Sequence, residues 1–320
     1  MAILNLLDLQ PTTISRDLRD KYILLYGPAK CGKTSFAAQI PNNLIFCFEK
    51  GVNFLPGVFA VDVPKWVEFK ALLKQLEKDE IKQKFKTVTI DTVSLAYDLC
   101  TQYICSQNNV KTVGELAYGK GYALVKDEFT KALRQISMLG YGIVLITHAK
   151  VKNVKVDDDS TIEIASPNIP DRAQDVVNAL VDIIGYIDVS YENGTATRTL
   201  ITRGTPNIVA GSRLKYLAPR IPFGYDELIN AIGEAIEKQA KIDGAKVVDK
   251  GTMQKVIEKR PFEETLAEAK ELWTKLVSEG KAEVVMAEVE SLFGEPMKLS
   301  EIPESKQDIF EVLIEDMRSM

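Results

Sequence analysis

The chain of 320 residues has little of what builds a disulfide or zinc framework, because it contains four cysteines in no C-x-x-C pair and a single histidine. The cysteines lie in apolar or motif segments, which is typical of reduced, packed thiols. They are Cys31, Cys47, Cys100 and Cys105. The sequence therefore predicts neither a disulfide scaffold nor a structural zinc site.

Long apolar runs are also absent, since none approaches the roughly 18 residues of a membrane span. The first residues, Met1–Asp8, show no basic leader and no small-residue cleavage site. We therefore expect a cytoplasmic protein with no membrane partner, in the host cytoplasm if the chain is phage-encoded. With 46% hydrophobic residues, the chain can form one large domain and an appendage.

The net charge of −5 is unevenly distributed along the chain. From Asp226 to Met320 there are 13 basic and 22 acidic residues, which leaves 27 basic and 23 acidic residues in the first 225. An acidic segment repels a phosphate backbone, so any contact with nucleic acid is expected in the first 225 residues.

The segment Gly27–Thr34 reads GPAKCGKT and fits the phosphate-binding pattern G-x-x-x-x-G-K-[ST]. An apolar run of strand length, 21–26, precedes it, and 35–40 can form a helix that Pro41 ends. A glycine-rich turn with a chance lysine is the alternative, but the flanking strand and helix favour a P-loop.

The chemistry of a P-loop assigns a role to each part of this segment. Its backbone N–H groups surround a phosphate at the positive end of the next helix, and Lys33 reaches the β and γ oxygens of ATP. Thr34 supplies a hydroxyl to Mg²⁺. ATP and Mg²⁺ are thus the expected cofactors. The candidate binding residues are Gly27, Pro28, Ala29, Lys30, Cys31, Gly32, Lys33, Thr34 and Ser35.

Apolar strands alternate with amphipathic helices through the first half of the chain. Strands are expected at 44–48, 87–91 and 142–146, and helices at 63–82, 93–106 and 122–139. This alternation predicts an α/β fold with a mostly parallel sheet that is covered on both faces.

Later segments predict antiparallel additions and a second module. A polar hairpin is expected from 151–156 and 161–164, and a second from 183–189 and 197–203, with a helix at 171–182 between them. Helices at 262–279, 281–293 and 305–319 indicate a small acidic module around Leu266, Leu272, Trp273 and Leu276. We therefore predict a core at 1–240 and a helical module at 251–320.

Two carboxylates are candidates for the chemistry of hydrolysis. Asp91 ends an apolar strand and suits the Walker B position, which holds the Mg²⁺ shell. Thr92 follows it in place of the glutamate that some ATPases use as a base, so the base must lie elsewhere. Glu49, at the end of the strand after the P-loop helix, is the obvious choice. A solvated charge paired with Lys50 is the alternative.

His148, the only histidine, follows the most apolar strand in the sequence Ile146-Thr147-His148. The carboxyl ends of strands in an open α/β sheet face the ligand crevice, which favours a γ-phosphate sensor. A hydrogen-bonded structural histidine is the alternative.

The order of these motifs resembles the RecA-like ATPases, and most closely the phage-encoded RecA-like single-strand annealing ATPases. The resemblance covers residues 20–225 by arrangement of motifs. It implies that Gly27–Thr34 is Walker A, Glu49 activates water, Asp91 is Walker B, and Thr147-His148 is the polar sensor pair.

The resemblance also implies partners. Single-stranded DNA would contact two stretches, 106–121 and 150–175, although Asp157–Asp159 in the second would repel phosphates. The candidate DNA-binding residues are Lys111, Lys120, Lys150, Lys152 and Lys155. A homo-oligomer, ring or filament, would complete each ATP site with a basic residue of the neighbour, for which Arg213 is the first choice.

Several functions are compatible with this sequence. The leading prediction is a Mg²⁺-dependent ATPase that oligomerises on single-stranded DNA and promotes annealing or strand exchange in phage recombination. A ring helicase or helicase loader, and a regulatory RecA-like ATPase that acts on proteins without DNA, are the alternatives. A small-molecule kinase is disfavoured because no arginine-rich lid is evident. The C-terminal module either docks a single-strand DNA-binding protein or caps the core.

Overall fold

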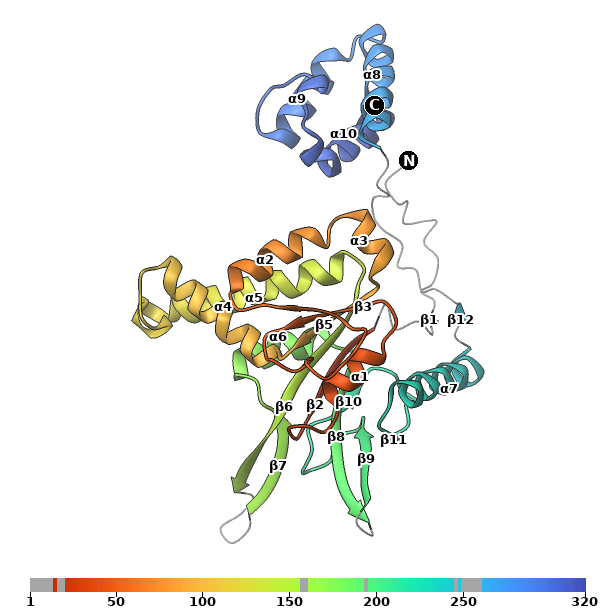
Figure 1. Ribbon diagram of the computed structural model, residues 1–320. Helices are drawn as coiled ribbons and strands as arrows, with labels where there is room; N and C mark the ends of the chain where they lie inside the picture. Colours follow the sequence, from red (N-terminus) through yellow and green to blue (C-terminus); the bar gives the residue numbers. More distant parts are fainter. Residues whose placement is uncertain (1–13, 16–20, 156–160, 193–194, 245–246, 249–260) are drawn as a thin grey trace. The chain divides into compact units, whose positions relative to one another are not determined.

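The computed structural model describes residues 14–15, 21–155, 161–192, 195–244, 247–248 and 261–320 (Figure 1). The chain divides into two compact units, Thr13–Gly251 and a second that contains Thr252–Met320. The predicted start of the helical module, residue 251, falls at this division. The acidic triplet 157–159 lies outside the described residues.

The larger unit is built on a ten-stranded sheet in the order β11-β9-β8-β2-β6-β5-β3-β4. All neighbours from β8 to β4 are parallel, whereas β9 and β11 are antiparallel additions at one edge. Two further strands pair off this path, β7 with β6 and β10 with β8. The predicted α/β fold, mostly parallel with antiparallel edge strands, is confirmed.

The strands of this sheet are β2 (Tyr22–Gly27), β3 (Asn43–Cys47), β4 (Phe59–Asp62), β5 (Thr87–Asp91), β6 (Gly142–Lys155), β7 (Thr161–Pro167), β8 (Ile183–Glu192), β9 (Thr195–Ile201), β10 (Gly211–Ser212) and β11 (Arg220–Pro222). Two short strands, β1 (Ile14–Ser15) and β12 (Val247–Val248), pair separately.

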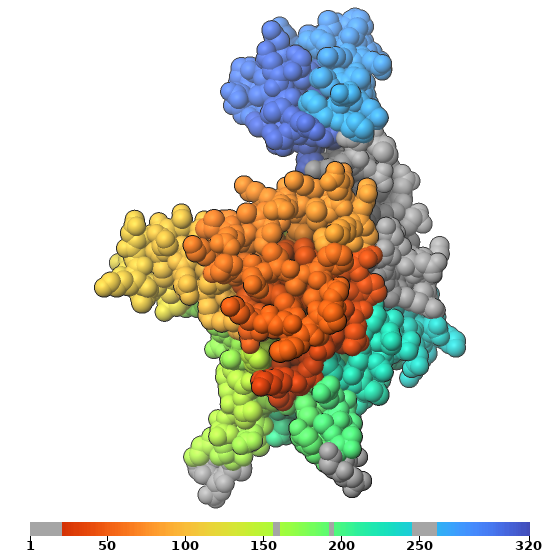
Figure 2. All heavy atoms as spheres, in the orientation of Figure 1, coloured from red at the N-terminus to blue at the C-terminus, as the bar shows by residue number. Residues whose placement is uncertain are grey.

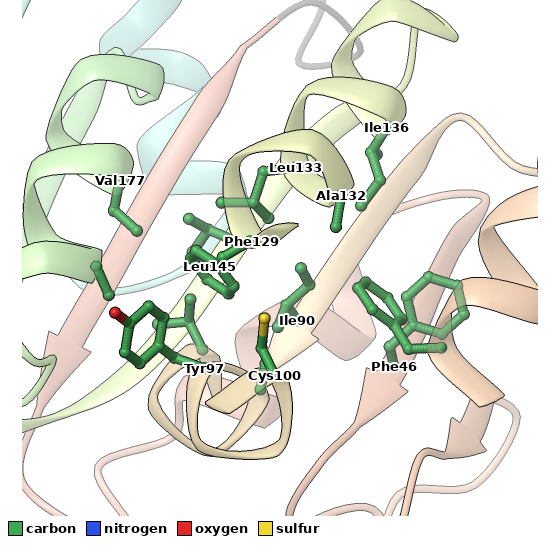
Figure 3. Close-up of a cluster of buried hydrophobic side chains, with 14 of the residues drawn as sticks. Phe46, Ile90, Tyr97, Cys100, Phe129, Ala132, Leu133, Ile136, Leu145 and Val177 are labelled. Carbon is green, nitrogen blue, oxygen red and sulfur yellow. The ribbon is translucent and has the colours of Figure 1, made fainter. Parts of the chain in front are cut away.

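Helices cover both faces of the sheet, as the alternating pattern predicts. One apolar cluster contains buried residues of α1 (Lys33–Gln39) and α7 (Tyr225–Asp243). The other contains residues of four helices, α2 (Trp66–Gln75), α4 (Val93–Gln107), α5 (Lys120–Met138) and α6 (Asp171–Leu180). Figure 3 shows part of this second cluster, where Phe129 of α5 lies among Leu145 of β6 and Ile90 of β5.

The helix predicted over 63–82 is two helices, α2 and α3 (Asp79–Lys84). The apolar spacing explains the break. Leu73 and Leu76 are buried on the core stripe, but the next apolar residue, Ile81, comes five positions later. A continuous helix would turn Ile81 off that stripe, so the chain extends at Lys78 and restarts.

Two long hairpins extend from the sheet, as Figure 1 shows. β6 runs unbroken for 14 residues from the buried core into its pairing with β7, so the predicted first hairpin is a continuation of a central strand. β8 continues likewise into its pairing with β9. In Figure 2 the two hairpins form separate green projections that diverge from the core. We call them the β6–β7 arm and the β8–β9 arm.

The second unit contains α8 (Phe262–Ser278), α9 (Ala282–Phe293) and α10 (Gln307–Ser319). Of its four predicted core residues, Leu276 is buried, and Leu266, Leu272 and Trp273 pack half-buried around the same cluster. Among the described helices of the chain, none combines the length and apolarity that crossing a membrane requires.

Candidate nucleotide site

The predicted site residues meet at one edge of the sheet because parallel strands present their carboxyl ends together. Gly27 at the end of β2 pairs with His148 of β6, and Asp91 at the end of β5 pairs with Cys47 of β3. The P-loop, Glu49 and Asp91 end or follow β2, β3 and β5, whereas His148 lies within β6, level with the end of β2, because β6 continues past this edge to Lys155. The predicted end of that strand before His148 is therefore wrong.

The loop between β2 and α1 has the backbone of a phosphate cradle. Lys30 and Gly32 adopt left-handed conformations, with φ of 60° and 101°. Left-handed residues of this kind are typical of loops whose successive N–H groups form an anion-binding nest. Lys33 is buried, and its Nζ donates to the carbonyl oxygens of Gly27 at 3.1 Å and Pro28 at 2.7 Å. The ammonium is thus held inside the curve of the loop, where it suits an anionic ligand.

Thr34 and Asp91 form the pair that would hold a divalent cation. The Thr34 hydroxyl donates to Asp91 Oδ2 at 2.6 Å. A Cβ on Gly51 would lie 3.4 Å from Thr34 Oγ1 and 3.7 Å from Asp91 Oδ2, so the backbone at Gly51 closes over the pair. A hydroxyl and a carboxylate are the oxygen ligands that Mg²⁺ takes beside water and phosphate, so these residues fit it.

The Asp91 carboxylate is 5% exposed. Burial raises its pKa, and the nearby Glu49 charge adds to this, whereas the hydrogen bond from Thr34 and the positive charge of Lys33 act in the opposite direction. A bound cation would supply further positive charge and favour the ionised form.

Glu49 lies beside this pair and faces His148. The backbone N–H groups of Phe48 and Glu49 both donate to the carbonyl oxygen of Asp91, at 2.6 and 3.2 Å. The Glu49 carboxylate lies 3.2 Å from His148 Nε2. Among the described residues the side chain that contacts the Glu49 carboxylate is therefore that of His148 and not that of Lys50. The structure therefore brings two of the candidate catalytic residues, Glu49 and His148, into contact.

Thr147, the other half of the predicted sensor pair, is buried, and its hydroxyl donates to the carbonyl oxygen of Asn168 at 3.2 Å. The Asn168 N–H donates in turn to the carbonyl oxygen of His148 at 2.8 Å. These bonds fix the backbone that carries the imidazole, which is itself partly exposed.

Arg213 lies away from its own P-loop. Its guanidinium donates to Asp182 Oδ1 at 3.0 Å and to the carbonyl oxygen of Ala179 at 2.8 Å. Asp182 contacts Tyr22, which begins β2, whereas the P-loop follows the other end of that strand. Arg213 could serve an ATP site only in a neighbouring subunit, and that role stays a prediction.

The predicted DNA-binding lysines fall on two surfaces. Lys111 and Lys120 are exposed where α4 connects to α5, and Lys150, Lys152 and Lys155 lie on the β6–β7 arm.

Lys150 donates to the carbonyl oxygen of Ile169 at 2.9 Å, and burial followed by the charge of Lys152 lowers its pKa. Lys152 lies 3.8 Å from Asp171 at the start of α6. The two surfaces approach each other where the Arg172 guanidinium stacks 4.1 Å from the ring centroid of Tyr122 in the first turn of α5.

Arg198 and Phe223 are site residues that no motif marks. A Cβ on Gly32 would lie 3.5 Å from Arg198 Nη1 and 3.5 Å from Phe223 Cε1. Arg198 belongs to β9, far along the chain from the P-loop, so only the pairing of β9 with β8 places it there. The sole signal in the sequence is its spacing of two from Leu200, which is buried on the α1 side of the sheet.

Two comparisons with known proteins bear on the site. Residues 19–214, more than half of the chain, match the family described as AAA domain. Over 323 aligned residues the chain is also 26% identical to a protein of Bacillus subtilis (strain 168), with 97% of each chain covered. That relative is described as SPbeta prophage-derived uncharacterized protein YorG.

Proposed function

The chain belongs to the AAA domain family of P-loop ATPases, and from that premise we propose that it is a Mg²⁺-dependent ATPase that oligomerises on single-stranded DNA and promotes annealing or strand exchange in phage recombination. The observation that carries the proposal is the juxtaposition of the Thr34–Asp91 pair with the Glu49–His148 pair beside the P-loop.

The chain's own residues account for each requirement of hydrolysis. Lys33 and the loop N–H groups bind the phosphates, and Thr34 and Asp91 would hold Mg²⁺, which supplies charge neutralisation when bound. Glu49 accepts a proton from the attacking water. His148 orients Glu49 through the 3.2 Å contact and is placed to sense the γ-phosphate, because it pairs with Gly27 at the start of the P-loop.

DNA binding is supported by charge and by the source of the relative. The β6–β7 arm carries three lysines, of which Lys152 and Lys155 are exposed, and the first 225 residues are free of the acidic excess that marks the C-terminal part of the sequence. A prophage-derived relative agrees with a phage role in the host cytoplasm. The antiparallel β8–β9 and β9–β11 pairings after a parallel core support the RecA-like form of the fold.

Assembly and partners are part of the same proposal. A homo-oligomer would let Arg213 of one subunit reach the ATP site of the next. The C-terminal module has an apolar core of its own, so it can dock a single-strand DNA-binding protein without contributing to the ATPase core.

The test is ATP hydrolysis by the purified protein with single-stranded DNA, with duplex DNA and without DNA, measured side by side. We expect stimulation by single-stranded DNA and binding to it at low salt. If the rate of ATP hydrolysis is the same with and without DNA, and the protein does not bind DNA at low salt, a regulatory ATPase would be the better interpretation. Unwinding of a forked duplex would favour the helicase.

A further inference from the structure

Arg198 has a defined position beside the P-loop. It lies opposite Val189 in the β8–β9 pairing and two residues from Leu200, so its side chain is on the face of the sheet that α1 and α7 cover. Its Nη1 and Cζ atoms lie 3.5 and 4.0 Å from where a Cβ on Gly32 would stand. The guanidinium is thus in van der Waals range of the phosphate cradle.

The neighbouring chain segment holds this strand in place. The N–H of Phe223 donates to the carbonyl oxygen of Arg198 at 3.0 Å. The Phe223 ring also stacks on Phe36 of α1, with 5.5 Å between ring centroids and 19° between planes. The backbone of Arg198 is therefore fixed to the helix that follows the P-loop, although its side chain is exposed.

Arg198 adds a positive charge beside the loop that carries Lys30 and Lys33. Among the described residues, no carboxylate forms an ion pair with Arg198. An arginine fork matches the geometry of phosphate oxygens and forms strong charge-assisted hydrogen bonds with them. A cationic group beside a phosphate cradle, without a protein anion to neutralise it, is suited to an anionic ligand in that cradle.

We propose that Arg198 binds the phosphates of the nucleotide held by the P-loop of its own subunit. This inference rests on the proposed nucleotide site and adds a residue to it. Arg198 differs in this from Arg213, which faces the opposite end of β2 and could act only on a neighbour.

The experiment is equilibrium binding of a fluorescent, non-hydrolysable ATP analogue with Mg²⁺ to the full chain. Arg198→Ala should weaken binding about ten- to hundred-fold, as expected for the loss of a hydrogen bond to a charged group. Arg198→Lys should restore part of it, because the charge returns without the fork. Arg220→Ala is the matched control, since Arg220 is also exposed but is next to buried Ile221 on β11 and faces the other side of the sheet. It should bind as the wild type does.

Lys33→Ala distinguishes loss of the nucleotide site from loss of the contact that Arg198 makes with it. If Lys33→Ala abolishes binding while Arg198→Ala leaves it unchanged, the nucleotide site stands and the assignment of Arg198 is wrong. If Lys33→Ala binds normally, the nucleotide site itself is wrong. Thermal unfolding of nucleotide-free Arg198→Ala should match the wild type. A lowered midpoint with no rescue by lysine would identify a structural role and overturn the inference.

Mixing Arg198→Ala with Lys33→Ala distinguishes action within one subunit from action between subunits. Each variant damages its own site if Arg198 acts within the subunit, so the mixture should hydrolyse no more ATP than the two variants do separately. Recovery of hydrolysis in the mixture would show that Arg198 serves a neighbour and would overturn the assignment.

Discussion

Replacing Thr34 with valine keeps the shape of the side chain and removes the hydroxyl that donates to Asp91 at 2.6 Å. Asp91 is 5% exposed and would be left with one fewer donor. A hydrogen bond to a charged group contributes about 1.5–3 kcal/mol. For a domain of this size each kcal/mol lowers Tm by roughly 2–4 °C, so the nucleotide-free variant should unfold about 3–12 °C below the wild type.

The stability deficit of the Thr34→Val variant should depend on pH, and it should change in one direction only. Burial raises the pKa of Asp91 and the Thr34 hydrogen bond lowers it, so the valine variant has a still higher pKa for this carboxyl. A carboxyl whose pKa is raised on folding loses its contribution to stability as pH rises through the folded-state value. The gap between the variant and the wild type should therefore widen as pH rises through that range and narrow in acid, where Asp91 is protonated in both.

The assay is thermal unfolding of the larger unit at several pH values, with and without ATP and Mg²⁺. Thr34→Ser keeps the hydroxyl and is the matched control. Ligand should raise the Tm of the wild type and of the serine variant and leave that of the valine variant nearly unchanged, because a ligand stabilises only the state that binds it. A valine variant as stable as the wild type at neutral pH, or a deficit of equal size in acid, would refute the reasoning.

Glu49→Gln should bind ATP normally and hydrolyse it at least about 100-fold more slowly, because general-base catalysis contributes about 10²–10⁴; steady-state turnover near the wild-type rate would remove Glu49 from the role. Phe129→Ala empties a fully buried position in the core between α4 and β6 and should cost about 3–5 kcal/mol of unfolding free energy in a denaturant titration. Replacing Lys152 and Lys155 together with alanine should reduce the salt slope of single-stranded DNA binding by about 0.7 for each phosphate that these lysines neutralise. An unchanged slope would mean that the β6–β7 arm does not touch the DNA backbone.

The positions around the P-loop can be predicted from sequence because local rules place them. Gly27, Glu49 and Asp91 each end or follow an apolar strand, His148 follows the apolar part of β6, and the carboxyl ends of parallel strands share one edge. The contact between Glu49 and His148 follows once their strands are assigned to that edge. The break between α2 and α3 is also a local feature. The spacing of apolar residues predicts it when that spacing is followed as far as Ile81.

The position of Arg198 beside the P-loop cannot be predicted from such local rules. Its place depends on how β9 pairs with β8, and a slip of one residue in that register would turn it to the other face of the sheet and bring its neighbour to the P-loop side. The spacing of Arg198 from buried Leu200 indicates which residues share a face of β9, but nothing near Arg198 in the sequence fixes the register with β8. The approach of Arg198 to Gly32 therefore comes from packing between distant segments, and the arginine that the structure places beside the P-loop is not the one that motif order favours.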